Sequence, residues 1–196
     1  MLVRVTWRVV SSNRSIRCRR YCSRCGGAAI FTSSGRFRVN TNGKRVDAWL
    51  VYTCDGCGRS WNLEILERAP VRTLAPATYQ QLLQNDGGLA RRYALDADRL
   101  RRRGAQPEPV DFEVHPSLTG DETPRATTSM EITMLLPEAL TIRLDRVLAV
   151  GLGRSRREIR QLGEQGGIDV VGADNRRALD RPVVNGQRVL IHGLGS

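Results

Sequence analysis

The chain has 196 residues, of which 40% are hydrophobic and 26% are charged, and its formal net charge at pH 7 is +11. This length allows one large domain or two to three small ones. The longest uninterrupted apolar stretches are only a handful of residues, too short to span a membrane, and arginine interrupts Met1–Arg8 before it could form the core of a signal peptide. We therefore expect a cytoplasmic protein that makes no membrane contact.

The positive charge is concentrated at the two ends of the chain. Residues 1–69 carry a net charge of +9, residues 70–142 carry −2 and residues 143–196 carry +4. Basic surfaces of this kind indicate a polyanionic partner, because clustered cations displace condensed counterions from a nucleic acid. The basic residues are also strongly biased toward arginine, since Lys44 is the only lysine among the 31. Genome composition is an alternative explanation of this bias.

The first predicted element is a β-hairpin. Two extended runs, residues 36–40 and 45–53, are separated by the pair Asn42-Gly43, and the second run alternates between apolar and mixed positions. Asn-Gly favours a type I′ turn, because both residues tolerate a positive φ angle. The pattern therefore predicts two antiparallel strands joined at Asn42-Gly43.

Two Cys-x-x-Cys pairs bracket this hairpin. They are Cys22 with Cys25 and Cys54 with Cys57, and 28 residues separate the pairs. Zinc takes four soft ligands at tetrahedral corners, and two tight turns can supply them. Disulfides, a thioredoxin-like redox motif and buried thiols are the alternatives, but there is no secretion signal and a redox site needs no second pair. We therefore expect a structural zinc ribbon, with Cys18 as a spare thiol.

Three aromatic residues of the expected ribbon, Trp49, Tyr52 and Trp61, have two interpretations. With the arginines at positions 36, 38 and 45 they could form a stacking surface for bases. Small ribbons also need large apolar side chains to build a core, and we favour this second interpretation.

The residues around this hairpin also carry a family resemblance. The segment from Arg36 to Tyr52, followed by Trp61-Asn62 and Glu67-Arg68, resembles a bacterial family catalogued as domain of unknown function ten sixty-two. That resemblance covers about the first hundred residues. It implies a zinc-ribbon-like start and brings no established activity.

From about residue 70 the apolar period becomes helical. Pro76 suits the first turn of a helix, residues 85–88 end it, and a second helix is expected over residues 89–100. Residues 105–139 contain five prolines and seven acidic residues. They are expected to form an irregular connector with one strand at 130–136.

The last part of the chain predicts two short helices and two short strands. Apolar residues at helical spacing from Leu144 to Leu148 mark the first helix. Ser155 and Glu158 have the spacing of a capping box and open the second helix. Residues 168–171 and 188–191 are expected to be strands.

The spacing of Arg143–Leu148, Ser155–Arg160 and Gly186–Ile191 resembles a small RNA-binding module named after ribosomal small-subunit protein four. The same module is appended to pseudouridine synthases and tyrosyl-tRNA synthetases. The resemblance implies two helices on a small sheet and a row of arginines that contacts structured RNA, ribosomal or transfer RNA. The module usually has a Val-Asn-Gly-Lys-like turn after its first strand, where this chain has Val170–Ala173.

The resemblance also implies which residues contact RNA. Guanidinium groups match phosphate geometry bidentately, so arginines on the second helix are the natural contacts. The residues that correspond are Arg143, Arg156, Arg157 and Arg160.

Together these features predict an α+β chain in three parts. The parts are a zinc-ribbon β domain at 1–69, a helical segment with an acidic connector at 70–139, and a small α/β-type module of two helices on a short sheet at 140–196. The expected function is non-catalytic binding of RNA. A protein-interaction adaptor that uses the ribbon and an RNA-modifying enzyme are the alternatives. No catalytic residue is expected, because His115 and His192 stand apart from any nucleophile or carboxylate pair in the sequence.

Overall fold

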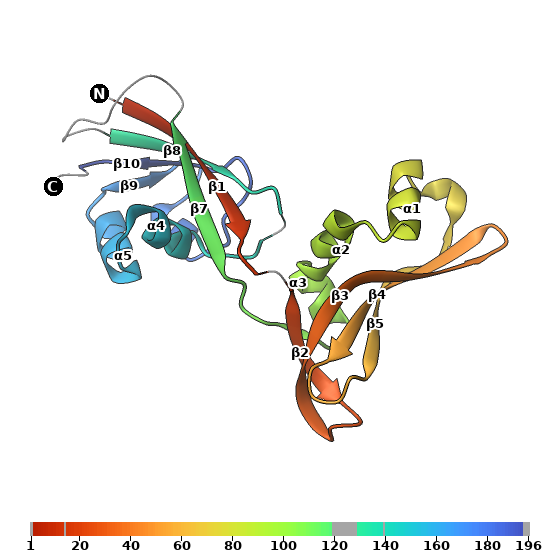
Figure 1. Cartoon of the computed structure of the whole chain (residues 1–196). Coiled ribbons are helices and arrows are strands. Elements are labelled where there is room, and N and C mark those ends of the chain that lie inside the picture. Colours follow the sequence, from red (N-terminus) through yellow and green to blue (C-terminus); the bar gives the residue numbers. More distant parts are fainter. Residues whose placement is uncertain (1, 14, 119–128, 139, 194–196) are drawn as a thin grey trace. The chain divides into compact units, whose positions relative to one another are not determined.

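The chain forms two compact units in the computed structural model, which describes residues 2–13, 15–118, 129–138 and 140–193. The terminal unit consists of Met1–Ser12 together with Val110–Ser196, and the central unit is Asn13–Pro109. Figure 1 shows a sheet flanked by helices in each unit. The expected segments 1–69 and 70–139 each contribute residues to both units. No helix in the described ranges is long and apolar enough to cross a membrane.

The central unit is built on an antiparallel sheet with the strand order β5-β4-β3-β2-β6. Its strands are β2 (Arg17–Cys22), β3 (Gly27–Asn42), β4 (Arg45–Cys54), β5 (Ser60–Pro70) and β6 (Gln106–Pro107). Every second residue of β4, from Val46 to Cys54, is buried, because successive side chains of a strand point to opposite faces. The predicted hairpin is confirmed as β3 and β4.

The turn of this hairpin differs from the prediction. Asn42 pairs with Arg45, so the two-residue loop is Gly43-Lys44, and of these four residues only Gly43 has a positive φ angle, 60°. The prediction of a type I′ turn at Asn42-Gly43 was therefore wrong. A two-residue loop with glycine first is the other common hairpin connection, and it needs a positive φ at one position only.

The helices of the central unit follow its hairpin in the sequence. After a 3-10 turn at Val71–Thr73, α1 (Pro76–Leu83) begins at the expected proline. The helix expected over residues 89–100 is divided into α2 (Gly87–Ala94) and α3 (Ala97–Arg102). Asp96 causes the division, because its side chain accepts a hydrogen bond from a backbone N–H of α3 at 2.9 Å and a capping residue is not helical.

The terminal unit is built on a mixed sheet with the strand order β7-β1-β8-β10-β9. Its strands are β1 (Leu2–Ser11), β7 (Phe112–Leu118), β8 (Ser129–Leu135), β9 (Ile168–Val170) and β10 (Arg188–Ile191). Only β1 and β8 run parallel to each other. Helices α4 (Leu144–Leu152) and α5 (Arg156–Glu164) lie on one face of the sheet (Figure 1), and α6 (Asn175–Leu179) follows β9.

The N-terminal strand completes the core beneath the C-terminal helices. Val3, Val5, Trp7 and Val9 are all buried, as expected for one face of a strand. The Trp7 ring packs against Gly151 of α4 so closely that a Cβ atom at Gly151 would lie 2.3 Å from the ring. Residues that are far apart in the sequence therefore share one core.

This packing gives a testable prediction. Gly151→Ala is expected to destabilise the terminal unit by about 1–3 kcal/mol, because an added methyl group in a filled core forces its neighbours to shift. Chemical denaturation measures the change. Gly87→Ala is the control, since no atom lies within 4 Å of a Cβ atom added there. Equal effects of the two substitutions would contradict the Trp7–Gly151 contact.

The expected α+β arrangement was wrong, because the chain is mostly β. The middle is not a helical segment, since β6, β7 and β8 belong to the two sheets. The C-terminal part is not two helices on a short sheet, since β1, β7 and β8 widen the sheet to five strands. Pro116 concealed β7 in the sequence. β7 is an edge strand, where the missing N–H of a proline is tolerated.

Candidate metal centre and arginine cluster

The four paired cysteines meet at one end of the central sheet. Their Sγ atoms all lie within 4.8 Å of one another. The Sγ–Sγ distance is 3.6 Å for Cys22 and Cys57, and 3.8 Å for Cys25 and Cys54. A tetrahedral ion with metal–sulfur bonds of about 2.3 Å separates its sulfurs by about 3.8 Å, whereas the sulfurs of a disulfide lie about 2.05 Å apart. The four cysteines could therefore hold a metal ion.

Two similar turns present these cysteines. Cys22 ends β2 and Cys54 ends β4, and the carbonyl oxygen of each accepts a hydrogen bond at 2.9 Å, from the N–H of Gly26 and of Gly58 respectively. The φ angles of these glycines are 74° and 73°, a conformation that residues with side chains rarely adopt. Each glycine thus closes a turn that brings the second cysteine of its pair back toward the first.

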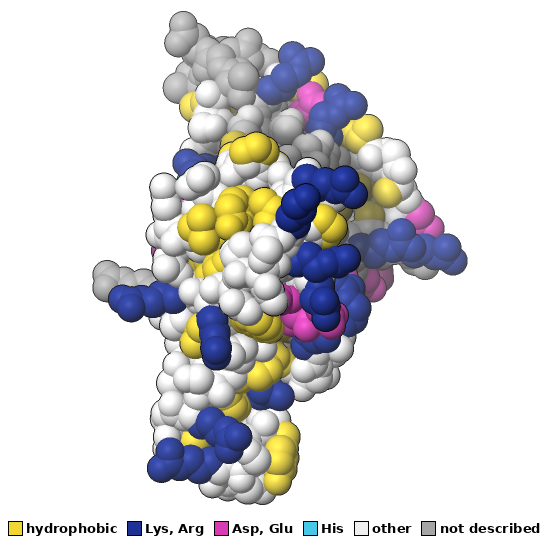
Figure 2. Space-filling view, turned by 90° about the vertical axis from the view of Figure 1, so that its right-hand side faces the viewer, with side chains coloured by type: hydrophobic (Ala, Val, Ile, Leu, Met, Phe, Trp, Pro, Cys, Tyr) yellow, Lys and Arg dark blue, Asp and Glu magenta, His cyan; other side chains and the backbone are white. Residues whose placement is uncertain are grey.

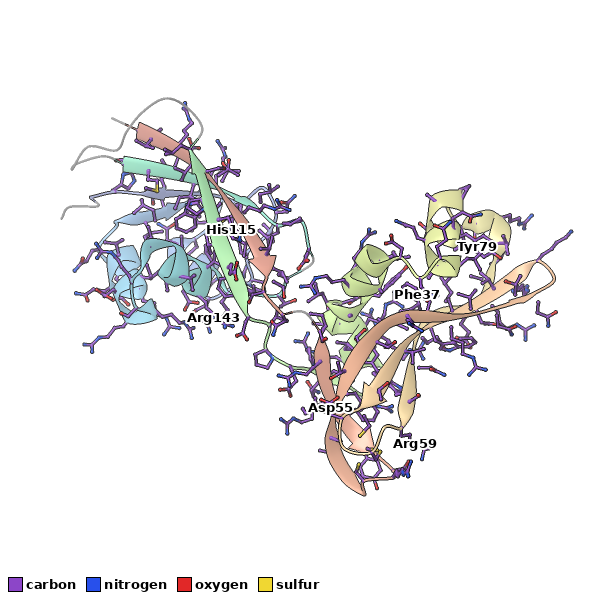
Figure 3. The ribbon with its side chains drawn as sticks, viewed as in Figure 1. Phe37, Asp55, Arg59, Tyr79, His115 and Arg143 are labelled. Atoms are coloured by element: carbon purple, nitrogen blue, oxygen red, sulfur yellow. The ribbon has the colours of Figure 1, made fainter. Side chains whose placement is uncertain are left out.

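The second turn is also tied to the neighbouring strand. The N–H of Asp55 donates to the carbonyl of Ile30 at 2.9 Å, and the Thr32 hydroxyl donates to the Asp55 carboxylate at 2.8 Å. Figure 3 shows Asp55 and Arg59 on this turn, close to sulfur atoms. These two hydrogen bonds hold the turn from Cys54 to Cys57 against β3.

The thiol of Cys22 ionises more readily than that of an ordinary cysteine. The backbone N–H groups of Cys25 and Arg24 point at its sulfur and, with hydrogen bonds from Cys57 and Cys54, lower its pKa to about 6. The pKa of Cys25 is raised to about 12, chiefly because its thiol is hydrogen-bonded to Cys57. Four adjacent thiolates would repel one another, and a metal ion among them would offset that charge.

Cys18 lies outside this group. It is buried within β2, and burial raises the pKa of its thiol to about 12 by disfavouring the charged form. A neutral, enclosed thiol is a poor nucleophile and a poor metal ligand. The structure therefore gives Cys18 a packing role.

The aromatic residues of the central unit divide between core and surface. Tyr52 is fully buried, and its ring lies 5.3 Å from that of Trp61. The Arg20 guanidinium lies 4.1 Å from the centre of the Trp61 ring, and Arg38 lies 6.0 Å from that of Trp49. Tyr52 thus belongs to the core, and the two tryptophans are half-buried beneath arginines.

Three of the four arginines expected to contact RNA surround one carboxylate in the terminal unit. Asp145, in the first turn of α4, has no exposed area and is the only buried charged side chain in the part of the chain that the structure describes. The Nη2 atoms of Arg156, Arg160 and Arg143 lie 2.8, 3.1 and 3.2 Å from its Oδ2 atom. We call these three arginines, with their neighbour Arg157, the arginine cluster.

The arginines of the cluster are partly exposed, so some of their N–H groups can donate to a ligand. The side chains of Arg143, Arg156 and Arg160 are 42%, 46% and 49% exposed. Asp180 also accepts hydrogen bonds from Arg143 and Arg160, whereas no ion pair joins Arg157 to another described residue. An open groove of about 570 Å³ is lined by Arg156, Arg157, Arg160, Gln161 and Glu164.

The charges around Asp145 predict a dependence of stability on pH. Burial raises the pKa of Asp145, but the hydrogen bond and charge of Arg156 and the charge of Arg143 outweigh it, so the pKa lies below its usual value. The carboxylate therefore stabilises the folded chain fully above the unfolded pKa of about 3.9, and this contribution is lost as the pH falls through the folded pKa.

We expect the free energy of unfolding of the wild type to approach that of Asp145→Asn as the pH falls below about 4. Chemical denaturation of both proteins at a series of pH values measures this difference. A difference that stays constant over the whole acidic range would contradict the ion pairs.

His192 has neighbours that the sequence does not reveal. Its Nε2 atom lies 3.3 Å from a carboxylate oxygen of Asp169, and its Nδ1 atom lies 3.2 Å from the hydroxyl of Ser129. The side chains of His192 and Asp169 are 44% and 56% exposed. These two contacts join β8 and β9 to the residue that follows β10.

Comparison with known proteins gives one family. The family model described as "Protein of unknown function (DUF1062)" matches residues 39–174. The match runs from β3 to the residue before α6, so it includes the second cysteine pair and the arginine cluster. It confirms the resemblance drawn from the first hundred residues and extends it into the terminal unit. No match was found to a curated protein or to a solved structure.

Proposed function

The chain belongs to the family described as "Protein of unknown function (DUF1062)", and we propose that it is a non-catalytic protein that binds structured RNA, ribosomal or transfer RNA, through the arginine cluster. One observation carries the proposal. Arg156 and Arg160 of α5 and Arg143, the residue before α4, converge on a single carboxylate and keep other N–H groups at the surface. Double-helical RNA is recognised mainly by its shape and its backbone, so such donors suit its phosphates.

The charge balance of the cluster supports an anionic ligand. Its four guanidinium groups outnumber the three carboxylates beside them, which are Asp145 and Asp180, the acceptors of hydrogen bonds from the cluster, and Glu164, which lines the same groove. Figure 2 views the molecule from the side of the central unit, and basic side chains prevail over acidic ones there as well. A surplus of arginine around an open groove favours a polyanion over a neutral partner.

The resemblance of Arg143–Leu148 and Ser155–Arg160 to the ribosomal-protein-four module supports RNA as the polyanion. The Ser155 hydroxyl and the Glu158 carboxylate form both hydrogen bonds of a capping box. This cap fixes the start of α5, and with it the positions of Arg156 and Arg160, which lie one turn apart.

We propose zinc as the ion held by Cys22, Cys25, Cys54 and Cys57. Four thiolates at tetrahedral spacing are typical of structural zinc, which contributes folding energy and keeps no position open for a substrate. The role assigned to the metal is therefore to hold together the two turns of the central unit.

Equilibrium binding to a structured RNA hairpin tests the proposed function. We expect saturable binding whose affinity falls steeply with salt, because the bound arginines release counterions from the RNA. Nucleoside analysis of the RNA after incubation is expected to give no new product. Absence of binding would contradict the proposal, and protein partners that survive nuclease treatment in a pull-down would favour an adaptor instead.

A further inference from the structure

We propose that Asp145 is a positioning residue, which orients Arg143, Arg156 and Arg160 for RNA phosphates, so that this acidic side chain strengthens the binding of a polyanion. The inference rests on the proposed function, because it names the residue that prepares the same site. Considered as a charge alone, an aspartate beside the groove would repel RNA. The geometry points to the opposite effect.

Asp145 fixes the orientation of Arg156 and Arg143 through two donors each, and it holds Arg160 through one donor, Nη2, at 3.1 Å. Arg156 donates from Nε at 3.2 Å and from Nη2 at 2.8 Å to the same Oδ2 atom. Arg143 donates to both carboxylate oxygens, from Nε at 3.3 Å and from Nη2 at 3.2 Å. A guanidinium carries five N–H donors in a rigid fork, so two donors bound to Asp145 set the direction of the remaining ones.

The position of Asp145 prevents it from competing for the ligand. Its side chain is completely buried, whereas those of its arginine partners are nearly half exposed. A phosphate in the groove would therefore contact the outer side of the guanidinium groups, with Asp145 on their inner side. The carboxylate also offsets the repulsion among the three guanidinium groups. Because it already holds their side chains in place, these side chains lose less conformational freedom when RNA binds.

Glu164 provides a contrast on the same groove. It lies in the last turn of α5, is exposed, and lines the groove together with Arg156 and Arg160. No ion pair joins it to a described residue. Glu164 can therefore repel a phosphate without orienting an arginine, which makes it the matched control for Asp145.

The test compares two substitutions that each remove one negative charge from the site. Asp145→Asn is expected to weaken binding of a structured RNA hairpin by about tenfold, and Glu164→Gln to strengthen it by about threefold. Dissociation constants are measured at one salt concentration, and circular dichroism checks that each variant is folded. If Asp145→Asn bound RNA as tightly as the wild type, or more tightly, the positioning role would be overturned.

A lysine substitution separates positioning from a structural effect. Arg156→Lys keeps the charge but loses the fork, so it should weaken binding in the wild type and add little in Asp145→Asn. Arg157→Lys is the control, because Arg157 makes no ion pair with Asp145, and its effect should be the same in both backgrounds. Additive effects of Arg156→Lys would overturn the inference.

The outcomes distinguish this inference from the proposed function. If the wild type fails to bind RNA, the proposed function itself is wrong. If the wild type binds and only the expected contrast between Asp145→Asn and Glu164→Gln is missing, RNA binding stands and the positioning role does not. If Asp145→Asn does not fold, the two lysine variants decide the question in the wild type. Equal losses for Arg156→Lys and Arg157→Lys would then count against positioning.

Discussion

Cys54→Ser is expected to abolish stoichiometric metal binding and to unfold the central unit. Serine preserves the size of the residue and the backbone hydrogen bonds of the turn, from the Cys54 N–H to Arg59 at 2.8 Å and from Gly58 to Cys54 at 2.9 Å. The effect of Cys54→Ser on metal binding and stability is therefore due to the missing sulfur. A structural metal site contributes its binding free energy to folding, about 10–16 kcal/mol in isolated zinc fingers, and this is as large as the whole stability of a typical domain, about 5–15 kcal/mol.

Metal analysis of the purified protein and thermal unfolding measure this effect. We expect about one metal ion per wild-type chain, and a chelator should reproduce the unfolding seen in Cys54→Ser. Cys18→Ala is the matched control, because Cys18 is buried in β2 but lies outside the four-cysteine group. It should keep the metal and lose only about 1 kcal/mol of stability through a small cavity. A Cys54→Ser protein that stays folded without metal would show that the centre does not support the fold.

The second large effect is expected for the double variant Arg156→Glu/Arg160→Glu. Each substitution removes a charged hydrogen-bond donor and places a carboxylate in the groove. Two lost charge-assisted contacts, at about 1.5 kcal/mol each, correspond to a loss of affinity for structured RNA of about 100-fold or more. Fluorescence anisotropy of a labelled hairpin measures the dissociation constant.

Two control proteins separate the effect of the arginine cluster from effects of net charge and misfolding. Arg8→Glu/Arg72→Glu changes the net charge by the same amount on exposed residues that form no ion pair with a described residue, and it should bind nearly as tightly as the wild type. Arg157→Glu introduces one acidic group without touching the partners of Asp145, so its fold should be intact, and about a tenfold loss is expected. If both double variants bind equally well, net charge and not the arginine cluster determines the affinity.

The features predicted correctly from the sequence depend on neighbours in the chain. The hairpin, the helix start at Pro76 and the capping box of Ser155 and Glu158 each follow from residues within a few positions. The four-cysteine site could be predicted for a similar reason, because the hairpin between the two cysteine pairs brings their turns together. Local periodicity and turn chemistry are sufficient in such cases.

The features that were missed depend on contacts between distant segments. β1 pairs with β7 and β8, more than a hundred residues later, and local periodicity carries no information about such partners. The alternation of Val3, Val5, Trp7 and Val9 with polar residues could have revealed β1 as a half-buried strand.

The role of Asp145 was hidden for a similar reason. An aspartate in the first turn of a helix usually complements the helix dipole. The arginines that enclose it follow 11 and 15 residues later. Only the packing of α4 against α5 brings Arg156 and Arg160 onto the carboxylate.

The salt dependence of RNA binding tests the central claim most directly. The affinity of the wild type and of Arg156→Gln/Arg160→Gln for one structured hairpin is measured over a series of salt concentrations. If these arginines contact phosphates, the slope of log K against log salt concentration should be steep in the wild type and shallower by about two in the double variant. An equal slope in the two proteins would contradict the assignment of RNA binding to the arginine cluster.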